Sequence, residues 1–199
     1  MNPRVAIALV LVGALALATA VFAATSRHGD PAEPASKFEG ALMPKGVRAP
    51  DFDLRDQDGH PISMRALRGK PVIVAFLYTT CRDTCPAQAN QVRGALDDLG
   101  HDVPAIAVAV DPPRDTPDSA KAFLSRTHTL GRIDFVLGSR KQLRPLWKGF
   151  AVQPQLPTVE HQSRITLVDR RGFQRIGFPG SEVTPERLAH DVRLLEHES

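Results

Sequence analysis

The chain has 199 residues, a net charge of +3 and an apolar fraction of 42%, which fits one globular domain with a terminal extension. Its 25 basic and 22 acidic residues are interspersed without a long run of one sign, which argues against a nucleic-acid-binding protein. A domain of about 150 residues buries enough surface to fold without covalent cross-links. The only two cysteines, Cys81 and Cys85, are therefore not needed as a structural framework.

The first predicted element is an uncharged apolar segment, Val5 to Ala24, that follows a short positive end. In a helix it would span roughly 30 Å, the thickness of a bilayer core, which predicts a membrane anchor. Small residues at 18–20 leave a cleaved signal peptide as the alternative. Either interpretation exports the rest of the chain to an oxidising compartment. Residues 1–24 are thus interpreted as an anchor or signal peptide, and residues 25–45, which are polar and contain Pro and Gly, as a flexible tether.

Residues 46–199 have the pattern of a folded domain. Phe52 to Leu54 and Pro61 to Ser63, separated by a polar turn, predict a β-hairpin. The continuous apolar run Pro71 to Tyr78 predicts a central strand that is buried on both faces. This strand leads directly into the loop with the two cysteines. Beyond the loop, apolar residues recur at helical spacing until Gly100.

A second buried strand is predicted over Pro104 to Val110. The remaining predicted elements are helices from Thr116, Ser139 and Thr184, a short strand over 135–137 and two strands over 164–168 and 173–178. Parallel β–α units followed by an antiparallel hairpin predict an α/β protein with a thioredoxin-like fold. Such a fold has a central mixed sheet flanked by helices, and here an N-terminal hairpin precedes it.

Cys81 and Cys85 directly follow a buried strand and stand where a helix is expected to begin. In α/β folds, ligands gather at the carboxyl ends of such strands, and a helix N-terminus stabilises a thiolate. If the first helical turn includes both residues, their spacing places both sulfurs on one face. Such a pair can exchange a disulfide. It also suits Cu(I), for which a neutral imidazole would complete a three-coordinate site.

Of the seven histidines, His161 is the one best placed to approach the sulfurs. It lies just before the strand over 164–168, and in a thioredoxin-like sheet the loop before this strand faces the cysteine turn. The other histidines lie in the tether, in turns or at exposed helix positions; they are His28, His60, His101, His128, His190 and His197.

Several segments, in the same order, resemble the Sco (SenC) family of copper-binding cytochrome c oxidase assembly proteins. They are DFDL (51–54), LRGK (67–70), YTTCRDTCP (78–86), VDPPRDTP (110–117) and VEHQS (159–163). The resemblance runs from about Val47 to Leu195. It implies a membrane-tethered thioredoxin-like domain in which Cys81, Cys85 and His161 hold copper, as Cu(I) or Cu(II).

The resemblance also implies what the protein acts on. The expected partner is the copper-bearing subunit of cytochrome c oxidase, at the periplasmic face of the inner membrane, with other copper chaperones or thioredoxin-like reductants as further partners. Two activities stay open: a copper metallochaperone, and a thiol–disulfide oxidoreductase in which Cys81 attacks and Cys85 resolves the mixed disulfide. A thiol peroxidase is disfavoured, because Val74 and Tyr78 stand where that chemistry needs Pro and Thr.

Overall fold

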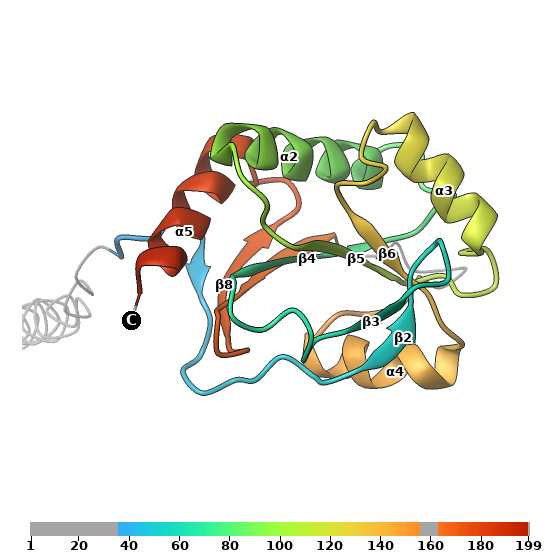
Figure 1. The fold of residues 1–199 in the computed structure, drawn as a ribbon, viewed down its shortest axis with the longest axis horizontal. Coiled ribbons are helices and arrows are strands. Elements are labelled where there is room, and N and C mark those ends of the chain that lie inside the picture. Colours follow the sequence, from blue (N-terminus) through green and yellow to red (C-terminus); the bar gives the residue numbers. More distant parts are fainter. Residues whose placement is uncertain (1–35, 156–162, 199) are drawn as a thin grey trace, which may run out of the picture. The chain divides into compact units, whose positions relative to one another are not determined.

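The computed structural model describes residues 36–155 and 163–198. From Phe38 onward they form one unit around a six-stranded sheet with the order β1-β8-β7-β4-β5-β6, next to a two-stranded sheet, β2-β3 (Figure 1). The strands are β1 (Ala41–Leu42), β2 (Asp53–Arg55), β3 (Pro61–Ser63), β4 (Val72–Leu77), β5 (Ala105–Ala109), β6 (Asp134–Val136), β7 (Arg164–Val168) and β8 (Gln174–Pro179). The described helices are α2 (Thr84–Leu99), α3 (Pro117–Arg126), α4 (Arg140–Gly149) and α5 (Pro185–His197).

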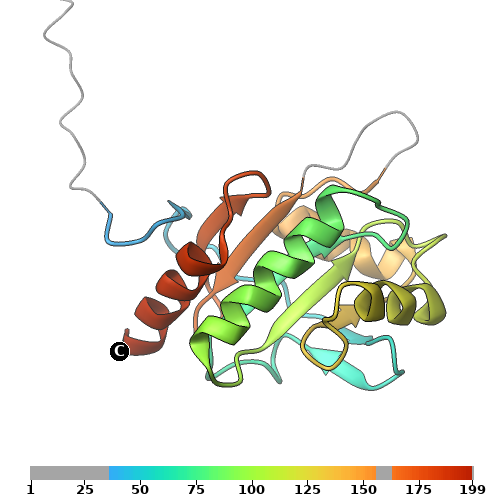
Figure 2. The same ribbon diagram turned by 90° about the horizontal axis from the view of Figure 1, so that it is seen from above.

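The sheet is mixed. Strands β4, β5 and β6 are parallel, whereas β7 is antiparallel to β4 and β8 is antiparallel to β7. Helices α2, α3 and α5 cover one face of the sheet, and α4 lies on the other face together with the β2–β3 hairpin (Figures 1 and 2). This confirms the predicted thioredoxin-like fold and its N-terminal hairpin.

The two continuous apolar runs form the centre of the sheet, as predicted. All residues of β4 and β5 are buried, because both strands have neighbours on each side and helices on each face. On the α4 face, the rings of Phe76 and Phe150 lie 5.2 Å apart, and the Trp147 indole N–H donates to the carbonyl of Ala109 at 2.9 Å. These contacts fix the carboxyl ends of β4 and β5, from which the candidate site is built.

The folded unit begins before residue 46. Ala41 and Leu42 pair with β8, although the sequence analysis assigned residues 25–45 to the tether. The Asp191 carboxylate accepts the backbone N–H groups of Glu39 and Gly40, at 2.8 and 2.9 Å. A strand of two residues has no hydrophobic period, so only its partners in the fold make it recognisable.

In the described part of the chain, no helix is both long enough and apolar enough to cross a bilayer. The segment 5–24, predicted to be a membrane anchor, and the rest of range 1–24 lie outside the described residues. His161 also lies outside them.

Candidate dithiol site

Both cysteines lie at the carboxyl end of β4, where the chain turns into α2. The Cys81 N–H donates to the carbonyl of Tyr78 at 3.3 Å, and α2 begins only at Thr84. Cys81 therefore precedes the helix, so the two cysteines do not share its first turn. Asp83 occupies the N-cap without a capping side-chain hydrogen bond. The Cys81 sulfur accepts the N–H of Cys85 instead, at 3.2 Å, as a capping oxygen would.

The two neighbouring cysteines differ in burial and in acidity. Both are free thiols; Cys85 is fully buried, and Cys81 is 6% exposed. Hydrogen bonds from the Cys85 thiol and the Thr84 hydroxyl, together with backbone N–H groups, lower the pKa of Cys81 to about 4. The pKa of Cys85 is raised, because its thiol donates a hydrogen bond to Cys81 and because the side chain is buried. Cys81 is therefore the sulfur that ionises more readily, and Cys85 is the one that holds its proton, which is the arrangement of a nucleophile with a resolving partner.

The loop after β5 braces the cysteine turn through the buried carboxylate of Asp115. One carboxylate oxygen accepts the N–H of Thr79 and the other accepts the N–H of Asp111, both at 2.8 Å. Burial raises the pKa of Asp115 to about 6. Arg114 pairs with the Asp111 carboxylate at 2.9 Å. The motif VDPPRDTP thus has a structural role here, because it ties the two loops at this end of the sheet together.

None of the described histidines joins the two sulfurs. Within residues 36–155 and 163–198, no Cys, His, Asp or Glu ligand atom forms a close group of three with the cysteines. The predicted third ligand, His161, cannot be placed because it lies outside the described residues. The described histidines occupy a hairpin turn or helix ends and surfaces, as predicted: His60, His101, His128, His190 and His197.

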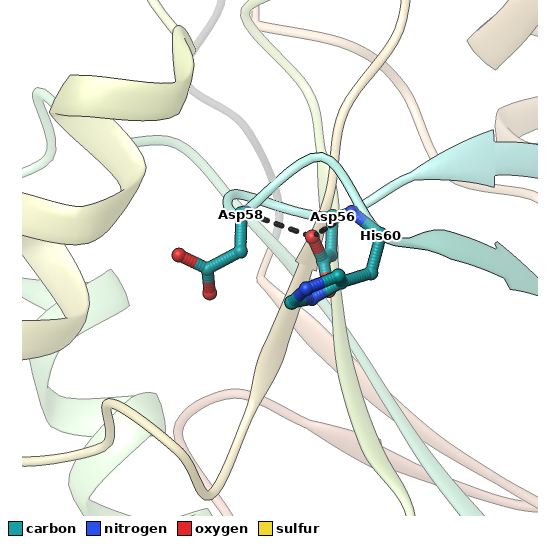
Figure 3. Close-up of side chains that lie close together, drawn as sticks. All are labelled: Asp56, Asp58 and His60. Atoms are coloured by element: carbon teal, nitrogen blue, oxygen red, sulfur yellow. Dashed lines mark hydrogen bonds and ion pairs between the residues drawn. The ribbon is translucent and has the colours of Figure 1, made fainter.

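A second group of ligand-type side chains, Asp56, Asp58 and His60, lies in the turn between β2 and β3, with ligand atoms within 4.8 Å of one another (Figure 3). One Asp56 oxygen accepts the N–H groups of both other residues, at 2.8 and 2.9 Å, and the second lies 3.3 Å from the His60 ring. Asp58 points toward α3, where Lys121 binds it at 3.0 Å. These carboxylates stabilise the turn and are already engaged within the protein.

Sequence reasoning missed two residues beside the dithiol. The Thr84 hydroxyl lies 3.5 Å from the Cys81 sulfur, and the side chain of Gln88 is buried one helical turn after Cys85. The signal for Gln88 was available, because a polar residue stands on the face of α2 whose other buried members are almost all apolar.

A family model described as SCO1/SenC matches residues 42–196. Among curated relatives, protein SenC of Rhodobacter capsulatus is 30% identical over 154 residues, which cover 71% of this chain and 67% of that protein. The chain spans 64% to 69% of the length of the first curated relatives it matches.

Two solved structures share the fold. BsSco, described as a member of the Sco family of cytochrome c oxidase assembly proteins with a disulfide switch, has a TM-score of 0.69 at 25% identity, covering 78% of this chain and 97% of its own. ScoI of Bradyrhizobium japonicum, solved with copper bound, has a TM-score of 0.61 at 29% identity, covering 74% of this chain and 99% of its own. Because the family model matches most of the sequence, this chain belongs to the SCO1/SenC family.

Proposed function

We propose that this protein binds one copper ion through Cys81, Cys85 and His161 and delivers it to the copper-bearing subunit of cytochrome c oxidase. The observation that carries the proposal is the meeting of two free, buried cysteines at the end of a central strand, where the Cys81 sulfur accepts the Cys85 N–H at 3.2 Å. Two thiolates and an imidazole form a donor set that suits Cu(I). The relatives support it, since BsSco belongs to a family of oxidase assembly proteins and ScoI was solved with copper bound.

The protonation of the pair determines what copper uptake requires of the chain. Cys81 is already a thiolate, whereas Cys85 carries a proton that it donates to Cys81. A metal-ligating cysteine must be deprotonated, so uptake releases the Cys85 proton to solvent and weakens as the pH falls. The Asp115 carboxylate accepts the N–H of Thr79, two residues before Cys81, and so holds the start of the cysteine turn in place.

Described residues on both sides of His161 support it as the third ligand. Before it, the N–H of Gln155 donates to the carbonyl of Val110, at the carboxyl end of β5. After it, the carbonyl of Ser163 accepts the N–H of Gly180 at 2.9 Å, at the start of β7. Strands β5 and β7 flank β4 on either side, so both anchors lie at the end of the sheet that carries the cysteines.

We further infer that the domain acts outside the cytoplasm, at the periplasmic face of the inner membrane, with residues 5–24 as its anchor. The apolar length of this segment supports an anchor. In an oxidising compartment the free thiols need a source of electrons, which a thioredoxin-like reductant would supply, and the copper would come from another copper chaperone.

Replacing His161 with Ala should weaken Cu(I) binding by the full chain at least about tenfold, because one of three ligands is lost. The affinity is measured by competition with a Cu(I) chelator under reducing conditions. The matched control is His197→Ala, which removes an exposed histidine at the end of α5 and should leave the affinity unchanged. Equal affinities of the His161→Ala and wild-type proteins would exclude His161 as a ligand.

Thiol–disulfide exchange is the second candidate function, and the low pKa of Cys81 favours it. The Cys81 thiolate would attack a disulfide of the target, form a mixed disulfide and release one target thiolate. Cys85, after losing its proton, would then attack Cys81, release the second target thiolate and leave a Cys81–Cys85 disulfide. Reduction of a target disulfide by a wild-type chain that binds no copper would establish this function in place of delivery.

A further inference from the structure

Gln88 carries a buried amide one helical turn after Cys85. Its side chain is 1% exposed, and neither Nε2 nor Oε1 has a hydrogen-bond partner among the residues that the structure describes. Both residues belong to the buried face of α2. Side chains three positions apart on a helix are neighbours, and they lean toward the N-terminus, which here carries the dithiol. An unpaired buried amide destabilises a fold, so its presence next to a reactive site requires a physical reason.

The surroundings of the amide are small and polar. A Cβ built on Gly180 would lie 2.6 Å from Gln88 Nε2 and 2.6 Å from the Cβ of Ser163, so the amide has room only because residue 180 is glycine. The Ser163 hydroxyl is also buried, and no described residue forms a hydrogen bond with it. Ser163 precedes β7, which pairs with β4 next to the cysteine turn. Two buried polar side chains with no partner among the described residues, Gln88 and Ser163, therefore lie against Gly180, at the end of the sheet that carries the cysteines.

We propose that Gln88 is a positioning residue of the dithiol, whose amide N–H donates to the Cys85 sulfur when that sulfur is a copper ligand. The inference rests on the proposed copper binding. In the free protein, the Cys81 sulfur accepts the Cys85 N–H at 3.2 Å, and the Gln88 amide lies one helical turn further along the same buried face with no partner among the described residues. As a copper ligand, the Cys85 sulfur is a buried thiolate, which is stabilised by hydrogen-bond donors. The backbone N–H of Tyr78 and the Thr84 side chain already act in this way, and the Gln88 amide would add a further donor.

The Gln88 amide can adjust when the Cys85 sulfur becomes a copper ligand. The terminal torsion of a glutamine side chain is soft, so the amide can turn without leaving its space. The Ser163 hydroxyl can then donate to Oε1 and leave Nε2 for the sulfur. Hydrogen bonds of this kind orient metal ligands and increase metal affinity from outside the ligand set. The unmet hydrogen bonds of the free protein are thus those that the loaded site uses.

The test is Gln88→Leu in the full 199-residue chain, which removes both polar atoms. Leu is preferable to Met, because a thioether can itself bind copper. Without metal, the variant should melt about 3–6 °C higher than wild type, since the unpaired amide is gone. Its Cu(I) affinity, measured by chelator competition, should nevertheless fall about 10- to 100-fold. A residue with only a structural role would not change stability and affinity in opposite directions.

Thr166→Val provides a matched control. The Thr166 hydroxyl is also fully buried and has no partner within the described part of the chain. It shares a face of β7 with Arg164, however, whose guanidinium donates to the carbonyl of Phe150 at the end of α4. This variant should raise the melting temperature and leave the Cu(I) affinity unchanged.

Two results would overturn the role of Gln88 while leaving copper binding intact. One is a Cu(I) affinity of Gln88→Leu within about twofold of wild type. The other is a lower melting temperature of the metal-free variant, which would show that the amide stabilises the free fold. If the wild-type chain itself binds no Cu(I), the proposed function fails and the role of Gln88 fails with it.

Discussion

Replacing Cys85 with Ala is expected to lower the Cu(I) affinity of the full chain greatly. Loss of a hydrogen bond to a metal ligand lowers affinity about 10- to 100-fold, and loss of the ligand itself should have a far larger effect. One of two thiolate ligands disappears, and the remaining donors cannot enclose a soft ion. The fold should persist, because Ala fits the fully buried position. Chelator competition under reducing conditions measures the loss. An affinity close to that of wild type would remove Cys85 from the site.

The Cys85→Ala protein also tests the hydrogen bond between the sulfurs. In wild type the pKa of Cys81 is lowered to about 4, so its alkylation rate should be nearly constant between about pH 6 and pH 8. Without the Cys85 donor, this pKa moves up toward its ordinary value, and the rate should rise steeply with pH over the same range. Iodoacetamide labelling at Cys81, followed by mass spectrometry, measures both profiles. Flat profiles in both proteins would contradict Cys85 as the cause.

Asp115→Ala should destabilise the folded domain by about 2–4 kcal/mol, because two buried backbone N–H groups lose a carboxylate acceptor. These are the N–H groups of Thr79 and Asp111, each bound at 2.8 Å. Urea unfolding of the full chain measures the free energy. The control is Asp102→Ala, which removes an exposed carboxylate and should change stability by less than about 0.5 kcal/mol. A loss for Asp115→Ala no larger than for the control would show that the brace contributes nothing.

Much of the fold could be predicted from the sequence, because its central strands and helix starts have strong local signals. The runs Pro71 to Tyr78 and Pro104 to Val110 are too apolar to lie anywhere but in the middle of a covered sheet. The predicted starts at Thr116, Ser139 and Thr184 are confirmed, since each side chain accepts a backbone N–H in the first turn of its helix.

The remaining features depend on contacts that no local pattern records. Strand β1 exists because β8 and Asp191 bind it, not because its two residues favour a strand. At the start of α2, the sulfur of Cys81 accepts the N–H of Cys85 in place of a capping oxygen, a contact that residue preferences do not indicate. The position of Cys81 and Cys85 at the end of β4 was predictable, whereas the unpaired amide of Gln88 appears only when α2 packs against Gly180.

The most direct test of copper binding by the dithiol is the copper content of the full chain with its thiols reduced and again after oxidation. The proposed function predicts one copper per chain when Cys81 and Cys85 are reduced. It predicts none once they form a disulfide, because both thiolate ligands are then consumed. Copper that remains bound to the oxidised chain, or a reduced chain that binds none, would contradict a site built on this pair.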